Sequence, residues 1–169
     1  MIVMVFGLPG SGKSFFASQL ARMLKAEYLN SDKMRRMMFD TRTYSIKEKL
    51  AVYKEMLKQM KEAERKHINL VMDATFYKND IRKIFLDGAK NREGIIFIEV
   101  RAEESLTRER LKKPRKDSEA DFEVYKKIKK QWQPLNEKHL ILQSTDDNIS
   151  EMLKKTAGYL HLENDKGTN

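Results

Sequence analysis

Residues 7–14 read Gly-Leu-Pro-Gly-Ser-Gly-Lys-Ser and have the types and spacing of a phosphate-binding loop. Gly10 and Gly12 allow the backbone N–H groups to turn toward one point, at which the positive end of the following helix is also directed. Lys13 would reach the β- and γ-phosphates of a triphosphate, and the Ser14 hydroxyl would complete the coordination of a Mg²⁺ ion. The motif therefore predicts binding of a nucleoside triphosphate with Mg²⁺.

Such a loop needs a strand before it and a helix after it, and the hydrophobic pattern indicates both. Ser31 and Ser118 are the expected N-caps of the helices that follow them. Strands and helices alternate along the chain, which predicts an α/β fold of three layers, with a parallel five-stranded sheet between helices on both faces. Strands are expected at residues 2–6, 27–30, 68–73, 94–100 and 140–142, and helices at residues 13–25, 33–39, 45–66, 79–90, 103–111, 118–133 and 148–162.

The length of 169 residues predicts one domain over residues 1–162, followed by a polar, disordered tail at residues 163–169. A chain of this length buries roughly 70% of its unfolded surface in a single core. It contains no cysteine, and its N-terminal apolar run has only five residues, too few for a signal peptide or a membrane span. We expect a cytoplasmic protein with no membrane partner.

The formal net charge is +9, which would attract polyanions. A nucleic-acid partner and an ordinary lysine-rich, solvated surface both explain such a charge. A nucleotide-binding enzyme also needs positive charge to hold its phosphates. The charge alone therefore leaves the partner open.

Two carboxylates follow predicted strands, at the edge where open α/β sheets bind their ligands. Asp73 ends an apolar strand, where it would hold a Mg²⁺-bound water; a surface turn is the alternative. Asp32 lies in the first turn of a predicted helix, where it would act in the site or serve as a helix cap. Farther along, Pro114 interrupts a basic stretch and predicts a mobile, arginine-rich lid at about residues 108–120.

The sequence resembles the P-loop kinases of the polynucleotide-kinase and zeta-toxin type, in particular their small predicted kinases. The resemblance covers residues 1 to 145. The sequence departs from the bacteriophage polynucleotide kinase at Ala74, where that enzyme has threonine and this chain places Thr75 one residue later. The segments of this chain that carry the resemblance are GLPGSGKS, LNSDKMRR, VMDATFYKNDIR and RERLKKPRKDSEADFEVY.

The resemblance implies specific roles for these residues in phosphoryl transfer. Asp32 would be the general base, Arg35 would bind a phosphate or other anion of the acceptor, and Thr75 and Arg82 would also contact the acceptor. The lid arginines Arg110 and Arg115 would close over the phosphates, and Arg115 would join Lys13 and Asp32 in catalysis. The expected nucleotide-binding residues of the loop are Gly7, Pro9, Gly10, Ser11, Gly12, Lys13, Ser14 and Phe15, and the expected metal-binding residues are Ser14 and Asp73.

The leading interpretation is an ATP- and Mg²⁺-dependent kinase that phosphorylates a hydroxyl group. The acceptor would be a polynucleotide 5′-hydroxyl, a nucleoside or nucleotide, or another small metabolite. A P-loop NTPase that acts as a switch for a protein partner is the alternative enzyme class, and a nucleic-acid-binding module without catalysis is a third class. Asp32, Arg35 and the basic lid favour the kinase, because a switch needs no base for an acceptor.

Overall fold

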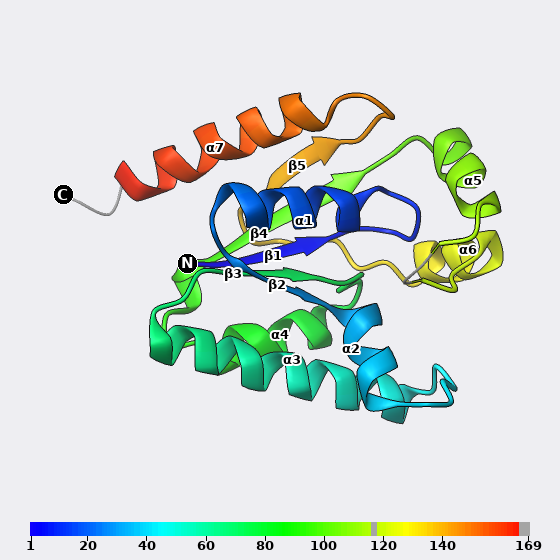
Figure 1. The fold of residues 1–169 in the computed structure, drawn as a ribbon, viewed down its shortest axis with the longest axis horizontal. Coiled ribbons are helices and arrows are strands. Elements are labelled where there is room, and N and C mark those ends of the chain that lie inside the picture. The colour runs from blue at the N-terminus through cyan, green and yellow to red at the C-terminus, as the bar shows by residue number, and fades with distance from the viewer. Residues whose placement is uncertain (116–117, 166–169) are drawn as a thin grey trace.

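The computed structural model describes residues 1–115 and 118–165. Its centre is one sheet of five parallel strands in the order β2-β3-β1-β4-β5 (Figure 1). This confirms the predicted parallel five-stranded sheet. The strands are β1 (Ile2–Phe6), β2 (Glu27–Asn30), β3 (Leu70–Asp73), β4 (Ile95–Arg101) and β5 (Leu140–Gln143).

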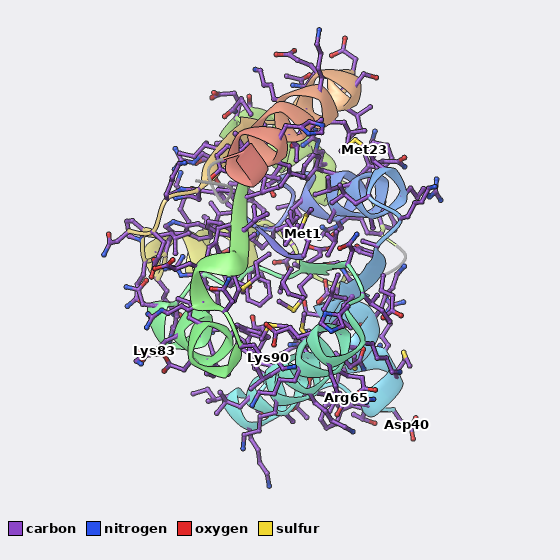
Figure 2. The ribbon with its side chains drawn as sticks, turned by 90° about the vertical axis from the view of Figure 1, so that its left-hand side faces the viewer. Met1, Met23, Asp40, Arg65, Lys83 and Lys90 are labelled. Carbon is purple, nitrogen blue, oxygen red and sulfur yellow. The ribbon has the colours of Figure 1, made fainter. Side chains whose placement is uncertain are left out.

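Helices cover both faces of the sheet. Figure 2 looks from the end where the strands begin and shows α1 and α7 on one side of the sheet, with α3 and α4 on the other. The three-layer α/β/α fold is therefore confirmed. The helices are α1 (Lys13–Met23), α2 (Ser31–Met38), α3 (Ile46–Lys66), α4 (Asn79–Gly88), α5 (Glu104–Lys112), α6 (Phe122–Lys130) and α7 (Ile149–Asp165), and a short 3₁₀ helix spans Arg92–Gly94.

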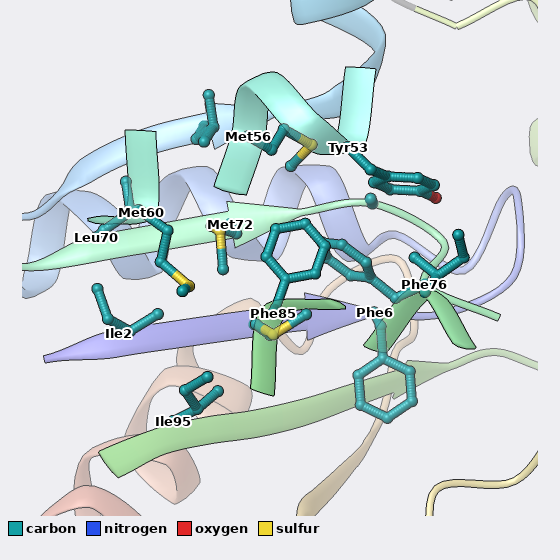
Figure 3. Close-up of a cluster of buried hydrophobic side chains, with 14 of the residues drawn as sticks. Ile2, Phe6, Tyr53, Met56, Met60, Leu70, Met72, Phe76, Phe85 and Ile95 are labelled. Carbon is teal, nitrogen blue, oxygen red and sulfur yellow. The ribbon is translucent and has the colours of Figure 1, made fainter. Parts of the chain in front are cut away.

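The central strand β1 is buried on both faces, which explains why its sequence is continuously apolar. Side chains alternate along a strand, so Met4 and Phe6 pack beneath α3 and α4, while Val3 and Val5 pack against α1 and α7. Figure 3 shows the first of these two clusters. The ring of Tyr53 belongs to this cluster, and its hydroxyl group points away from the cluster.

The C-terminal ends of the strands carry the predicted functional residues. Val5 of β1 and Asn30 of β2 both pair in register with Asp73 of β3, so the segments that follow these strands begin side by side. α5, α6 and the segment between α2 and α3 all lie beyond this edge of the sheet (Figure 1).

Two predicted N-caps are wrong. The cap of α2 is Asn30, whose side-chain oxygen accepts a hydrogen bond from the Lys33 N–H at 2.9 Å, and Ser31 is already helical. The cap of α6 is Asp121, which accepts from the Val124 N–H at 2.9 Å; α6 ends at Lys130. Each segment contains two residues of a type that caps helices, Asn30 and Ser31 at the start of α2 and Ser118 and Asp121 before α6. The residue that directly precedes the first helical residue is the one that caps.

Replacing Asp121 by alanine is expected to destabilise the fold by about 1 kcal/mol, because the helix loses its cap. Ser118→Ala is the matched control and should change the free energy of unfolding by much less. Urea denaturation of both variants measures the difference. Equal losses in the two variants would contradict the assignment of Asp121 as the cap.

The C-terminal helix is longer than predicted. α7 continues to Asp165, into the segment expected to be a disordered tail, since no glycine or proline lies between Leu162 and Gly167 to end the helix. The rest of that tail, residues 166–169, and the lid residues 116–117 lie outside the described residues. Within the described part of the chain, none of the helices combines the length and apolar character needed to cross a bilayer.

Candidate active site

The loop between β1 and α1 has the backbone conformation of a phosphate-binding loop. Gly10 and Gly12 have φ angles of 77° and 86°, in the left-handed region that favours glycine. A side chain at position 12 would also place its Cβ 2.7 Å from Ser144 Oγ. The sequence therefore needs glycine here both for the turn and for the close approach of the loop after β5.

The N-terminus of α1 is open toward this loop. Gly12 is its N-cap, no side chain caps it, and its first turn contains no acidic residue. The first N–H groups of a helix have no partner within the helix, and together with the helix dipole they attract anions. Lys13 and Ser14 occupy this first turn, so a phosphate bound here would meet the N–H groups, the ammonium group and the hydroxyl together.

A cavity of about 500 Å³, which we call the nucleotide cavity, extends from the loop toward β5 and α7. It has the size of a small-molecule site, which is roughly 300–1,000 Å³. The expected nucleotide-binding residues Gly10, Gly12, Lys13, Ser14, Phe15, Arg110 and Arg115 line it, together with Phe16, Lys113, Pro114, Ser144, Thr145, Asp146, Asn148, Ile149 and Met152.

Arg110 joins the lid helix α5 to the loop after β5. Its guanidinium donates hydrogen bonds to the Ser144 hydroxyl at 3.1 Å and to the Thr145 carbonyl at 2.9 Å, and it contacts Asp146 Oδ1 at 3.3 Å. It also lies 3.4 Å from the Gly10 carbonyl oxygen. Arg110 therefore fixes one wall of the nucleotide cavity to another.

Asp73 is completely buried beside the loop, and its two carboxylate oxygens differ. Oδ2 accepts hydrogen bonds from the Tyr28 hydroxyl at 2.7 Å and from Asn30 Nδ2 at 2.6 Å, whereas Oδ1 has no partner among the described residues. Burial, followed by the charge of Asp73, raises the pKa of Tyr28, which stays a neutral donor. A buried carboxylate oxygen without a donor fits a water on Mg²⁺, and the Ser14 hydroxyl fits as a direct ligand.

A second cavity, of about 320 Å³, lies beneath α6 and the lid, and we call it the acceptor cavity. Lys13 and Ser14 line both cavities, which therefore meet at the phosphate-binding loop. The expected acceptor-side residues Asp32, Arg35 and Thr75 all line it. The other lining residues are Pro9, Asn30, Ser31, Tyr44, Lys49, Tyr53, Asp73, Ala74, Tyr77, Ser118, Glu119, Ala120, Val124, Lys127, Ile128 and Gln131.

Asp32 is half-buried in the wall of the acceptor cavity, with 35% of its side chain exposed. Burial raises the pKa of its carboxyl group above the ordinary value, although the positive charges of Lys13 and Arg35 oppose this shift. Arg35 Nη1 lies 3.3 Å from Asp32 Oδ1. A carboxylate that is partly desolvated and oriented by an arginine is suited to accept a proton.

Arg35 is itself buried and held by a second carboxylate. Its Nε lies 3.0 Å from Glu48 Oε1, and its guanidinium lies over the Tyr44 ring, 4.9 Å from the ring centroid. Glu48 in turn accepts hydrogen bonds from the Thr43 backbone and hydroxyl groups at 2.7 and 2.9 Å. Two carboxylates thus flank the charge of Arg35.

The lid closes the acceptor cavity through contacts between its end and the segment after α2. Glu119 accepts a 2.6 Å hydrogen bond from Arg42 Nη2 and another from the Tyr44 hydroxyl. Arg115 donates a 2.5 Å hydrogen bond to the Ala120 carbonyl and also lines the nucleotide cavity. Burial lowers the pKa of Arg115, with the charge of Asp32 opposing the shift.

Three residues from the predicted site lie elsewhere. Arg82 lies on the buried side of α4, where its Nη2 donates to the Asn79 side chain and to the Gln133 carbonyl; it does not line the acceptor cavity. Ser11 is also buried and lines a separate cavity next to Glu99. Gly7 packs against β4, where a Cβ would lie 2.3 Å from the Val100 carbonyl oxygen.

Sequence reasoning missed residues that come from distant segments. Lys49 and Tyr77 form one such pair, with the Lys49 ammonium 3.0 Å from the Tyr77 hydroxyl oxygen. Burial raises the pKa of Tyr53 to about 12, while its hydrogen bond with Thr75 opposes the shift.

One signal in the sequence could have indicated the far wall of the nucleotide cavity. It is the polar run from Ser144 to Asn148, which lies between a strand and a helix, because parallel strands end at the ligand-binding edge of the sheet.

Solved structures with a similar fold include several kinases. They include a sugar kinase from Janibacter sp. HTCC2649 at 13% identity and a TM-score of 0.74, covering 95% of this chain and 94% of that chain. A gluconokinase from Sinorhizobium meliloti 1021 has 16% identity and a TM-score of 0.70, with 95% of both chains covered. The APS kinase CysC of Mycobacterium tuberculosis, in complex with AMPPNP and APS, has 17% identity and a TM-score of 0.70, covering 95% of this chain and 96% of that chain. At these identities the likeness concerns the fold.

No curated protein matches the chain in sequence. A family model described as AAA domain matches residues 2–135. That range contains the phosphate-binding loop and every residue that lines the acceptor cavity. Together with the kinase fold, the match confirms the resemblance to small P-loop kinases, and the chain belongs to the AAA domain family.

Proposed function

We propose that this protein is an ATP- and Mg²⁺-dependent phosphotransferase that moves the γ-phosphoryl group to a hydroxyl group of an acceptor. One observation carries the proposal: the nucleotide cavity and the acceptor cavity meet at Lys13 and Ser14. Asp32 lines the acceptor cavity but not the nucleotide cavity. Transfer between two bound molecules needs this arrangement, with donor and acceptor held end to end and a base on the acceptor side.

The proposed reaction uses the side chains as follows. The acceptor oxygen bonds to the γ-phosphorus while the bond to the bridging oxygen of ADP breaks, and Asp32 takes the acceptor proton. Lys13 and the N–H groups of α1 stabilise the charge that develops on the phosphate oxygens. Mg²⁺, held by the Ser14 hydroxyl and through water by Asp73, would neutralise further phosphate charge.

Arg115 is the lid arginine that suits the transferred phosphate. Arg110 is occupied by the Ser144, Thr145 and Asp146 contacts that hold the wall of the nucleotide cavity. Arg115 makes one hydrogen bond with a described residue, to the Ala120 carbonyl, and part of its guanidinium is left for a phosphate. A guanidinium that meets the transferred group stabilises the charge of the transition state.

The similar structures support a hydroxyl acceptor in general terms. A sugar kinase, a gluconokinase and an APS kinase with bound AMPPNP and APS share this fold. The acceptor proposed for this chain is a polynucleotide 5′-hydroxyl, a nucleoside or nucleotide, or another small metabolite. The net charge of +9 supports the first of these.

Incubation with γ-labelled ATP and Mg²⁺ tests the proposal. We expect label to move from ATP to a hydroxyl compound when the protein meets a panel of 5′-hydroxyl oligonucleotides, nucleosides, nucleotides and sugars. Chromatography of the products measures the transfer, and a reaction without Mg²⁺ is the control. Release of labelled phosphate to water alone, at a rate that no panel member changes, would replace the kinase by the hydrolytic switch.

A further inference from the structure

Four cationic side chains line the acceptor cavity, and two of them already have an assigned partner, either the transferred phosphate or a carboxylate of the protein. The cations are Lys13, Arg35, Lys49 and Lys127. Lys13 faces the transferred phosphate at the junction of the cavities. Arg35 lies between Glu48 and Asp32, at 3.0 and 3.3 Å, so its charge is compensated within the protein.

Lys49 is the half-buried cation that remains. Its ammonium group donates a 3.0 Å hydrogen bond to the Tyr77 hydroxyl and makes no ion pair within 4.0 Å with any described residue. An ammonium group has three donors, so two are left for a ligand. Lys127, which is exposed on α6, adds a second positive charge to the same cavity.

The position of Lys49 in its helix is unfavourable without a ligand. It follows the Ser45 cap by four residues, just after the first turn of α3, near the end at which the helix dipole disfavours a positive charge. The Ser45 side chain caps this helix end, and Glu48 is the acidic residue of its first turn. A bound anion in the acceptor cavity would therefore interact favourably with the ammonium group of Lys49, which lines that cavity.

The carboxylates that line the acceptor cavity all have other partners and do not balance the charge of Lys49. Asp32 is paired with Arg35, and Asp73 accepts hydrogen bonds from Tyr28 and Asn30. Glu119 is held by Arg42 and the Tyr44 hydroxyl. Apart from Lys13, which faces the transferred phosphate, Lys49 is thus the half-buried charge of the cavity that makes no ion pair with a described carboxylate.

The shape of the cavity favours a small acceptor. Its volume of about 320 Å³ is at the low end of small-molecule sites, which span roughly 300–1,000 Å³. Glu119 of the lid reaches across to Arg42 and Tyr44 and closes it. The tyrosines Tyr44, Tyr53 and Tyr77 give it walls suited to a carbon skeleton rather than to a chain of phosphates.

We infer that the acceptor is a small hydroxyl compound that bears an anionic group, a phosphate or a carboxylate, and that Lys49 binds this group. The inference rests on the proposed phosphotransferase activity and specifies its substrate class. Lys49 is then a specificity residue, which binds the acceptor at one end while Asp32 meets the hydroxyl at the other.

Matched pairs of acceptors test the substrate class. The pairs are ribose with ribose 5-phosphate, glucose with gluconate, and adenosine with adenosine 3′-phosphate, each at saturating ATP with γ label; a 5′-hydroxyl oligonucleotide is the further arm. We expect the anionic member of at least one pair to have a kcat/KM at least about 10-fold above that of its neutral partner, since a charge-assisted hydrogen bond contributes about this much. The pairs also separate phosphate from carboxylate.

Variants of Lys49 test its role. Lys49→Met should raise the KM of the anionic acceptor about 10- to 100-fold, with little change in the KM of ATP or in the kcat/KM of the neutral partner. Lys49→Arg should restore most of the loss, because it keeps the charge. Lys54→Met, on the exposed side of α3, is the matched control and should behave as wild type. Because Lys49 makes no ion pair with a described residue, Lys49→Met leaves no carboxylate unpaired and should be at least as stable as wild type in urea.

The outcomes separate the two proposals. If a neutral compound or only the oligonucleotide is phosphorylated, or if Lys49→Met lowers activity on both members of a pair equally, the substrate class is wrong and the kinase stands. If no compound becomes labelled while ATP is hydrolysed, the phosphotransferase proposal itself falls, and the acceptor class falls with it.

Discussion

Replacing Lys13 by alanine is expected to lower kcat for phosphoryl transfer by at least about 10³-fold. Lys13 lines both cavities at their junction and makes no ion pair within 4.0 Å with another described residue. Its ammonium group therefore has phosphate oxygens as its proposed partners and no carboxylate partner among the residues that the structure describes. Steady-state transfer of label from γ-labelled ATP measures the loss.

The control for this experiment is Lys90→Ala, a substitution of the same type at an exposed residue at the opposite end of the molecule (Figure 2). Both variants should keep the circular dichroism and the urea midpoint of wild type, because neither removes a buried contact. Wild-type turnover by a correctly folded Lys13→Ala protein would eliminate the P-loop mechanism. A parallel loss of activity in Lys90→Ala would mean that net charge, rather than position, is responsible.

The parts of the site that the sequence predicted are those fixed by local structure. Gly10, Gly12, Lys13 and Ser14 lie within one turn between a strand and a helix, so their spacing determines their geometry. Asp73 was predictable for a different reason: it ends an apolar strand, and parallel strands bring their C-terminal ends to one edge of the sheet.

The parts that could not be predicted depend on contacts between segments far apart in the chain. Glu119 meets Arg42 across 77 residues, and no periodicity or motif relates the two. Lys49 reads as one of many lysines on the polar side of a long helix, and only the fold brings it beside Tyr77. Arg82 shows the reverse, since its motif pointed to the acceptor, while its side chain is fixed in the core by the Gln133 carbonyl.

Asp32→Asn is the second large effect we expect. If Asp32 accepts the proton of the acceptor hydroxyl, the amide should lower kcat by roughly 10²- to 10⁴-fold, with little change in ATP affinity. Because burial raises the pKa of this carboxyl group, wild-type kcat/KM should fall off on the acidic side at a higher pH than for an ordinary aspartate. The residual activity of the Asn variant should lack this acidic limb.

Stability distinguishes a catalytic Asp32 from a structural one. Its pKa is raised above the ordinary value of 3.8 in the folded protein, so the folded state binds the proton more tightly than the unfolded chain. The contribution of Asp32 to stability is therefore greatest below 3.8 and is lost as the pH rises through the folded pKa. Asparagine carries no charge, so Asp32→Asn should match or exceed wild type in urea at neutral pH, because Glu48 still holds Arg35. A variant that loses both stability and ATP binding would instead make Asp32 a structural partner of Arg35, and the general base would have to be sought elsewhere in the acceptor cavity.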